Sequence, residues 1–421
     1  MYSGALSTAE KLLSEISRTL LARIQGQTTI LLTSLGHSGT HWSAATFYLL
    51  VPFIAKDLGL TYSQAGLFVA LFHSGALVAN FSSGLLTDIT GRRVLLQFIS
   101  LAVGGLALMA FGFTTHYIVL CAMVVLIGAT NNLWHPPAIS YLSSHYPKSR
   151  GYALAIHGLG ANIGDAVAPL VAGVLLLSFT WQGTAVANSI PILVVAGILL
   201  IYLMPHDRPS ADGIRRGMGL RDYFTGMLTV IKERAVLGLC LMTGLRAMAQ
   251  TGLLAFLPLY LANVMEIGPL WMGVTLMGMQ VGGMIATPIA GILSDRIGRR
   301  SVVVAGLSST TILIIALTFV TNDIAYIVGV SVLGLSLYAV RPVVQSWMLD
   351  LTPDRLGGSA TSLMFGMQSG LAIIMPIIGG IIADAYGLKA VFYFIAAAML
   401  AANIVAMTLT RDAKAENVRA T

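Results

Sequence analysis

GLLTDITGRR at residues 84–93 returns in closely similar form as GILSDRIGRR at residues 291–300. The two stretches keep their glycines, an aspartate and a closing pair of arginines, and they lie 207 positions apart. The spacing recurs elsewhere, since Pro52 matches Pro258 and His-Pro at 135–136 matches Arg-Pro at 341–342, each at an offset of 206. A constant spacing of this kind indicates an internal repeat, so we expect two halves that share one fold.

The composition indicates that both halves lie in a membrane. The 421 residues include only 24 Lys or Arg and 17 Asp or Glu, or 10% charged residues, whereas soluble domains carry about 25%. Hydrophobic residues make up 56% of the chain. Apolar stretches of about 20 residues, long enough to cross a bilayer, lie at 28–54, 62–87, 93–113, 116–142, 151–178, 183–204, 236–262, 269–293, 301–320, 324–349, 359–383 and 388–410. We therefore expect an all-α polytopic membrane protein with twelve transmembrane helices in two six-helix bundles, and we exclude a soluble enzyme.

The basic residues predict the orientation of the chain. Of the Lys and Arg residues, 20 fall on one side of the spans and only Lys56 and Lys389 on the other. Because Lys and Arg accumulate on the cytoplasmic side, we expect an inner (plasma) membrane protein with both termini in the cytoplasm. The net charge of +7 follows from this bias, and no single basic stripe suggests nucleic acid as a partner.

The same pattern divides the chain into five parts. Residues 1–27 are predicted to be a cytoplasmic amphipathic segment, with a short helix over 5–25 that lies on the membrane surface and begins in a capping box of Ser7 and Glu10. The remaining parts are an N-terminal bundle at 28–204, a cytoplasmic linker at 205–235, a C-terminal bundle at 236–410 and a cytoplasmic tail at 411–421. Because six spans return the chain to its starting side, the two bundles are expected to have the same orientation.

The repeated loop resembles the signature between the second and third helices of each half in the major facilitator superfamily. The resemblance covers essentially the whole chain, although the first copy has Ile89 where the family usually has a basic residue. It implies a transporter whose loops form a conformational latch at the cytoplasmic ends, with the aspartates capping helices or pairing with arginines. The residues of this expected latch are Gly84, Asp88, Gly91, Arg92, Arg93, Gly291, Asp295, Arg296, Gly298, Arg299 and Arg300. A plain basic turn is the alternative, and two copies in register make it the weaker interpretation.

Three short motifs are similar to those of a narrower group, the fosmidomycin-resistance-type transporters and related antiporters. They are SLGH at 34–37, WHP at 134–136 and the glycine- and proline-containing stretch GLGANIGDAVAP at 158–169. This resemblance implies proton-driven efflux, that is, antiport, and leaves the substrate open.

Ionisable residues inside the spans are the candidates for function, because a charged side chain at membrane depth costs roughly 2.5–3.5 kcal/mol and needs a partner or a role. Two arginine–glutamine pairs at i,i+4 spacing, Arg246 with Gln250 and Arg341 with Gln345, each place both members on one helix face. In the superfamily the first and fourth helices of each half line the central cavity, so the resemblance points both arginines at the substrate. Two guanidiniums at one cavity favour an anionic or zwitterionic cargo; the alternative is that each arginine braces helices locally.

The N-terminal half carries titratable groups instead of arginines. His37, His41 and His135 are candidates for substrate contact or proton relay, although a lone histidine in a membrane is more often a packing residue. Asp165 is the only acid well inside a span, and His157 lies two turns before it, so we assign these two to proton coupling. The alternative for Asp165 is a structural hydrogen bond in a glycine-rich helix.

No cofactor or metal site is expected. His37 and His41 have no carboxylate nearby on their own span, the two cysteines (Cys121 and Cys240) lie in separate apolar stretches, and no strand precedes a glycine-rich loop that could hold a nucleotide. The energy is therefore expected to come from an ion gradient or from the gradient of the substrate itself. The expected partners are a small organic anion or drug-like substrate, protons and membrane lipids.

The sequence thus predicts a monomeric secondary active transporter, not an enzyme, that exports a small anionic or zwitterionic organic solute by alternating access with proton coupling. Proton-coupled uptake of an anionic metabolite is the first alternative. A lipid flippase for a lysophospholipid-like headgroup is the second, since it too would use a cationic cavity. A non-transporting membrane sensor would need an appended signalling domain, which the short tail does not offer.

Overall fold

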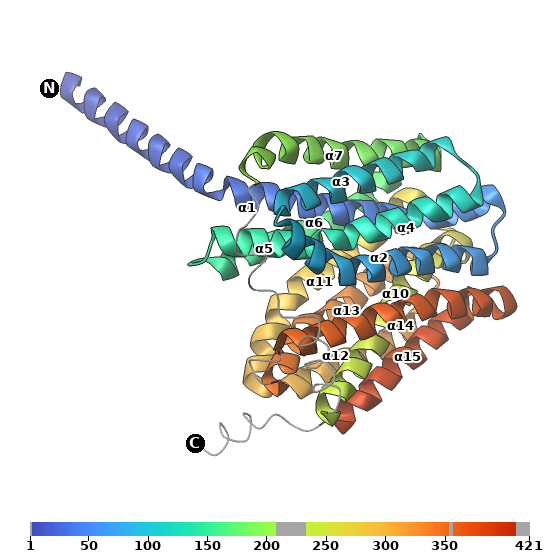
Figure 1. The fold of residues 1–421 in the computed structure, drawn as a ribbon. Coiled ribbons are helices and arrows are strands. Elements are labelled where there is room, and N and C mark those ends of the chain that lie inside the picture. The colour runs from blue at the N-terminus through green and yellow to red at the C-terminus, as the bar shows by residue number, and fades with distance from the viewer. Residues whose placement is uncertain (1, 208–232, 353–356, 410–421) are drawn as a thin grey trace, which may run out of the picture.

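A computed structural model describes residues 2–207, 233–352 and 357–409, and the side chains from residue 27 onward in most of these ranges. The described residues form helices and their connections (Figure 1). The N-terminal half contains α1 (Tyr2–Leu58), α2 (Tyr62–Thr90), α3 (Arg93–Ala110), α4 (Tyr117–Leu133), α5 (His135–His145), α6 (Arg150–Leu175) and α7 (Trp181–Tyr202), with short 3₁₀ turns at Phe111–Phe113 and Met204–His206. The C-terminal half contains α10 (Arg234–Asn263), α11 (Pro269–Ile297), α12 (Arg299–Leu317), α13 (Asp323–Leu351), α14 (Gly357–Tyr386) and α15 (Leu388–Thr408).

The predicted fold class is confirmed. Eleven of the helical segments in the described ranges are long and apolar enough to cross a membrane, with α4 and α5 together forming one of them. The first expected span, 28–54, lies in the C-terminal part of α1. The linker at 208–232 and the tail from 410 lie outside the described residues.

The N-terminal segment differs from the sequence prediction. The structure has one continuous helix from Tyr2 to Leu58, and its N-terminal part projects away from the bundle (Figure 1). The separate surface helix over 5–25 is therefore wrong, and Ser7 lies inside a helix instead of at its N-cap. The physical reason is that no proline stands between residue 5 and the first span, and the single glycine at the junction, Gly26, lowers helix propensity by only about 1 kcal/mol, so the backbone continues into the span without a break.

The glycines of the repeated loop end the second helix of each half. Gly91 follows α2 with a φ of 61°, and Gly298 follows α11 with a φ of 92°, both in the left-handed region that side chains with a Cβ avoid. In the second copy Arg299 pairs with Asp295 at 2.5 Å and with Asp350 at 3.2 Å. In the first copy the carboxylate of Asp207 accepts the N–H groups at the start of α3, a capping role that the sequence had suggested for Asp88.

The two halves meet along α2 with α14 and along α6 with α11. Hydrogen bonds join them at one end, where the backbone N–H groups of Tyr62 and Ser63 donate to the carboxylate of Asp384 at 2.8 and 2.9 Å. A Cβ on Gly66 would collide with the carbonyl oxygen of Pro376, so these helices touch at backbone distance. The latch residues lie at the opposite end of the helices, and the hydrogen bonds and ion pairs described for them stay within one half, as for Arg93 with Ser144.

Candidate functional site

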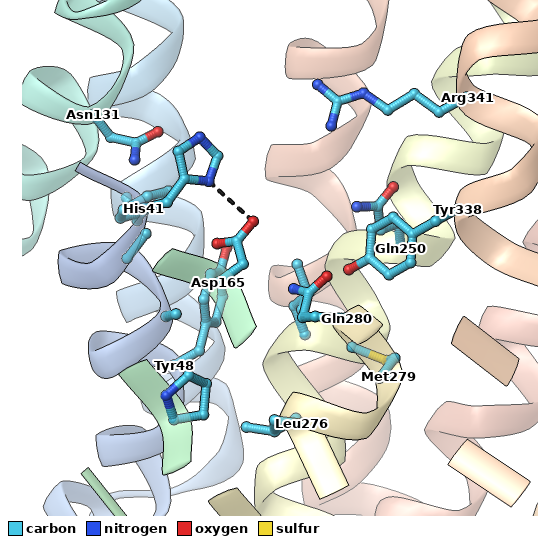
Figure 2. A pocket seen from close by; sticks show the side chains of 15 residues that line it. His41, Tyr48, Asn131, Asp165, Gln250, Leu276, Met279, Gln280, Tyr338 and Arg341 are labelled. Carbon is cyan, nitrogen blue, oxygen red and sulfur yellow. Dashed lines mark hydrogen bonds and ion pairs between the residues drawn. The ribbon is translucent and has the colours of Figure 1, made fainter. Parts of the chain in front are cut away.

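A cavity of about 170 Å³ lies between the two halves (Figure 2). The N-terminal half contributes His41, Ala44, Ala45, Tyr48, Phe72, Asn131, Asp165 and Pro169, and the C-terminal half contributes Gln250, Leu254, Leu276, Met279, Gln280, Tyr338 and Arg341. A carboxyl group therefore lies on one wall and a guanidinium on the other. Both halves must hold their positions for the cavity to exist, as an alternating-access site requires.

His41 and Asp165 are joined by a hydrogen bond on the N-terminal wall. The Nδ1 atom of His41 lies 3.0 Å from Oδ2 of Asp165, and the two side chains are 20% and 25% exposed. A carboxylate accepts hydrogen bonds, so the proton lies on Nδ1 and leaves Nε2 of His41 with its lone pair free. The pair joins α1 to α6 and can bind a proton at the cavity wall.

Close packing of α6 against α1 brings this pair together. A Cβ on Gly160 would collide with the carbonyl oxygen of Ser34, and a Cβ on Gly164 would collide with that of Ser38. Small residues four positions apart on one helix allow such approach in membrane proteins. Because Asp165 follows Gly164 directly, the approach that these glycines permit also sets the carboxylate beside His41.

We expect Gly160→Ala to destabilise the protein, whereas Gly158→Ala is harmless. The added methyl group at 160 meets the backbone of α1 and forces the helices apart, at a cost of about 1–3 kcal/mol. Around Gly158 no atom lies within 4 Å of the added carbon, so alanine there only improves helix propensity. Thermal unfolding of the purified variants should show a lower midpoint for the first alone; equal midpoints would contradict the packing argument.

Arg341 carries the positive charge of the C-terminal wall. Its side chain is exposed at the cavity, with Tyr338 one turn earlier on α13 and Gln250 on α10 close by in the same view (Figure 2). The ion pairs formed by the described residues do not include it. An arginine with no carboxylate partner at a cavity surface is suited to bind an anion.

Arg246 differs from the expectation that both guanidiniums line the cavity. It is buried, with 4% exposure, and its Nη1 donates to Oε1 of Gln250 at 3.0 Å and to the carbonyl oxygen of Leu337 at 3.4 Å. The sequence placed Arg246 and Gln250 on one face, and they do touch, but only Gln250 reaches the cavity. Arg246 therefore lies behind the wall as a second positive charge, and Gln345 on α13 is likewise not among the lining residues.

The remaining histidines form a stack behind His41. The ring of His37 lies 4.0 Å from that of His157, nearly parallel, and 5.1 Å from that of His135. His135 follows a break at Trp134 between α4 and α5, where Pro136 and Pro137 remove two backbone donors. Trp134 fills the space beside Gly36, so this break packs directly on α1. The cluster thus joins three helices, although of its members only His41 lines the cavity.

Sequence reasoning missed four polar lining residues: Tyr48, Asn131, Gln280 and Tyr338. Helical spacing could have found two of them, because Tyr48 lies seven positions after His41 and Tyr338 three before Arg341. Gln280 stands out as a polar residue within an apolar stretch. Asn131 likewise lies within the apolar stretch 116–142, and its side chain is oriented by donation to the carbonyl oxygen of Thr40 at 3.0 Å.

The chain is similar in sequence and fold to proteins described as transporters or resistance proteins. The chain is 24% identical to the uncharacterized MFS-type transporter YfnC of Bacillus subtilis (strain 168) over 80% of this chain and 82% of that protein. It is 24% identical to the multidrug resistance protein MdtG of Enterobacter lignolyticus over 86% and 88%. The fold matches the crystal structure of the nucleoside transporter NupG with a TM-score of 0.78 and 12% identity, covering 90% of this chain and 99% of that one.

The family follows from the sequence profile of the Major Facilitator Superfamily, which matches residues 33–286 and 239–421. The two matched ranges together span nearly the whole chain, and both halves carry the expected loop. With the cavity between its two bundles, the chain belongs to the Major Facilitator Superfamily and is a multi-pass membrane transporter, not an enzyme.

Proposed function

We propose that this transporter exports a small anionic or zwitterionic organic solute by alternating access with proton coupling. The observation that carries the proposal is the pair of walls around the cavity, with Arg341 on one side and the His41–Asp165 pair on the other. The likeness to MdtG, whose name states multidrug resistance, supports efflux. So do the short motifs similar to fosmidomycin-resistance-type transporters.

The charges favour a cargo with a negative group. Arg341 at the surface and Arg246 behind it place two positive charges on one side of the cavity, and neither takes part in the ion pairs of the described residues. An anionic group bound to Arg341 compensates them. The volume of about 170 Å³ is below the roughly 300–1,000 Å³ of sites for drug-sized ligands, which favours a compact solute.

The wall that carries His41 and Asp165 determines how proton binding is coupled to cargo binding. If the cargo is a zwitterion, its ammonium group binds the carboxylate of Asp165, and a proton on Asp165 competes with it, which produces exchange of cargo for proton. If the cargo is a pure anion, protonation of Asp165 removes a repulsive charge and favours binding, which produces transport in the same direction. Antiport and symport therefore predict opposite pH dependences of cargo binding.

Purified protein in proteoliposomes tests the proposal. A panel of small zwitterions and anions is compared with their uncharged esters or amides, under a pH gradient of each sign. We expect accumulation of at least one charged solute driven by the gradient, none of its neutral analogue, and cargo affinity that rises with pH. Affinity that falls with pH would favour uptake by symport, and selective binding of phospholipid would favour a flippase; transport of the neutral analogues alone would reject the charged cargo.

We also propose that the repeated loops act as the latch and face the cytoplasm. In this state the halves are joined at the end that carries Asp384, and each loop bonds within its own half. Closure of the cytoplasmic end would bring the two loops together and open the far end, as in rocking of the two bundles.

The orientation predicts where added cysteines react. In a background without Cys121 and Cys240, Ser3→Cys and Arg419→Cys should be protected from a membrane-impermeant maleimide in intact cells and labelled after permeabilisation. A cysteine at Thr114, in the loop after α3, should react in intact cells. Labelling of either terminus in intact cells would overturn the orientation.

A further inference from the structure

We propose that His37, His41 and His135 bind a divalent transition-metal ion of the zinc type. One ring nitrogen from each lies within 4.8 Å of the other two. The ring centroids are 4.9 Å apart for His37 and His41, 5.1 Å for His37 and His135, and 5.9 Å for His41 and His135. Three convergent imidazoles are a donor set that zinc and its neighbours among the transition metals prefer over Mg²⁺ or Ca²⁺.

The hydrogen bonds of the cluster prepare its nitrogens for a metal. Nδ1 of His37 lies 2.8 Å from the carbonyl oxygen of His157, so it must donate a proton there, and Nδ1 of His41 donates to Asp165. The rings of His37 and His41 are thereby each left with a lone pair on Nε2. Metal-binding histidines show this pattern, in which the second nitrogen donates to a carbonyl or carboxylate that fixes the ring and increases its basicity.

One buried ring nitrogen of the cluster lacks a hydrogen-bond partner. The Nε2 atom of His37 is buried and, within the described ranges, has no hydrogen-bond partner, and the residue as a whole is only 6% exposed. A buried polar atom without a partner costs about 1–3 kcal/mol. A metal ion bonded to Nε2 satisfies that atom, and the neighbouring stack with His157 holds the ring in place.

The geometry requires only a small closure. Nitrogens bound to one zinc ion at about 2.0–2.1 Å lie roughly 3.3 Å apart in a tetrahedral site. The ring nitrogens now lie within 4.8 Å of one another, so they must approach by up to about 1.5 Å. His37 and His41 lie one turn apart on α1, and His135 is at the start of α5, beside the proline break. The site borders the cavity at His41, so the fourth ligand position is open to water or an anion.

The expectation of no metal site considered only carboxylates on the span that carries His37 and His41. Neither His37 nor His41 has a carboxylate on its own helix, yet the packing of α6 on α1 brings Asp165 to His41 from 124 positions away. The carboxylate also offsets part of the charge of the ion, while Arg341 stands on the opposite wall (Figure 2). Metal binding makes no use of the cargo or of Arg341, although it shares His41 and Asp165 with the proposed proton-binding wall, so the test below is made without cargo.

The test is calorimetric titration of the full-length protein with ZnCl₂. The protein is purified on a tag without histidines, stripped with a chelator and titrated without any organic solute. We expect one Zn²⁺ per chain, at least tenfold weaker binding in His135→Ala and in His37→Ala, and unchanged binding in the matched control His116→Ala, since His116 precedes α4 away from the cluster. Zinc should raise the unfolding temperature of the wild type and of the control, but not of His135→Ala.

A rescue variant separates loss of a ligand from loss of the fold. His135→Cys supplies a thiolate that also binds zinc, so it should recover zinc binding and, with Co²⁺, show a thiolate-to-metal absorption band that the wild type lacks. Absence of zinc binding by the wild type, or equal binding by the wild type and a variant with all three histidines replaced by alanine, would overturn the proposal. Either result leaves cargo transport untested, because no cargo is present.

Discussion

Arg341→Ala is expected to abolish transport and to weaken cargo binding by roughly 100-fold or more. Removing one partner of a desolvated charge pair costs about 2–5 kcal/mol, and Arg341 is the charged side chain with which the C-terminal half lines the cavity. Arg341→Lys should retain part of the affinity, because lysine keeps the charge and loses the planar two-donor geometry. Binding of a cargo identified in the transport panel, measured by calorimetry, gives both values.

Gln345→Ala is the matched control for this prediction. It lies on α13 one turn after Arg341, within the same helix, and is not among the residues that line the cavity. We expect it to change cargo affinity by no more than about threefold. Full transport by Arg341→Ala would remove the anion site, and equal losses in both variants would indicate damage to α13 in place of a lost contact.

Asp165→Asn is expected to uncouple transport from the proton gradient. The amide has nearly the same shape and can still accept the hydrogen bond from His41, but it cannot bind and release a proton. Accumulation driven by a pH gradient should therefore fall at least tenfold. For a purely anionic cargo, exchange of labelled for unlabelled cargo in the absence of a gradient should stay within about threefold, whereas for a zwitterion exchange should weaken too, because its ammonium group loses the carboxylate. Both are measured in the same proteoliposomes.

Asp57→Asn provides the comparison for the proton step. Asp57 accepts a hydrogen bond from Trp181 at 2.9 Å, near the end of α1, and is not a lining residue of the cavity. Gradient-driven accumulation by this variant should match the wild type. If Asp165→Asn accumulates cargo with unaltered pH dependence, Asp165 has the structural role that the sequence left open, and the proton must bind elsewhere.

The sequence predicted the membrane fold better than it predicted the site. Hydropathy depends on local composition, and the structure accordingly has long apolar helices. The repeated loop depends on spacing along the chain, and its glycines end α2 and α11. At the cavity, His41, Asp165, Gln250 and Arg341 were candidates from the sequence and lie together. Helical spacing placed each residue on a face, but it did not say which face met the cavity and which met another helix.

Arg246 shows the difference between a contact set by local spacing and one set by a distant helix. Its i,i+4 relation to Gln250 is a local property, and the hydrogen bond between them follows from it. Whether Arg246 reaches the cavity depends instead on α13, which offers the carbonyl oxygen of Leu337 to it from 91 positions away and leaves it buried.

The sequence by itself determined that this chain crosses a membrane many times, that its halves are repeats, and that one half carries titratable groups where the other carries arginines. These properties follow from hydrophobicity, helical period and spacing, which act over a few residues. Only the tertiary structure decided that Asp165 belongs to His41, that three histidines from α1 and α5 converge, and that one arginine of two borders the cavity. Those outcomes depend on how closely helices approach at small residues such as Gly160 and Gly164. The spacing of these glycines is a local pattern, but which distant helix packs against them is not written in the local sequence.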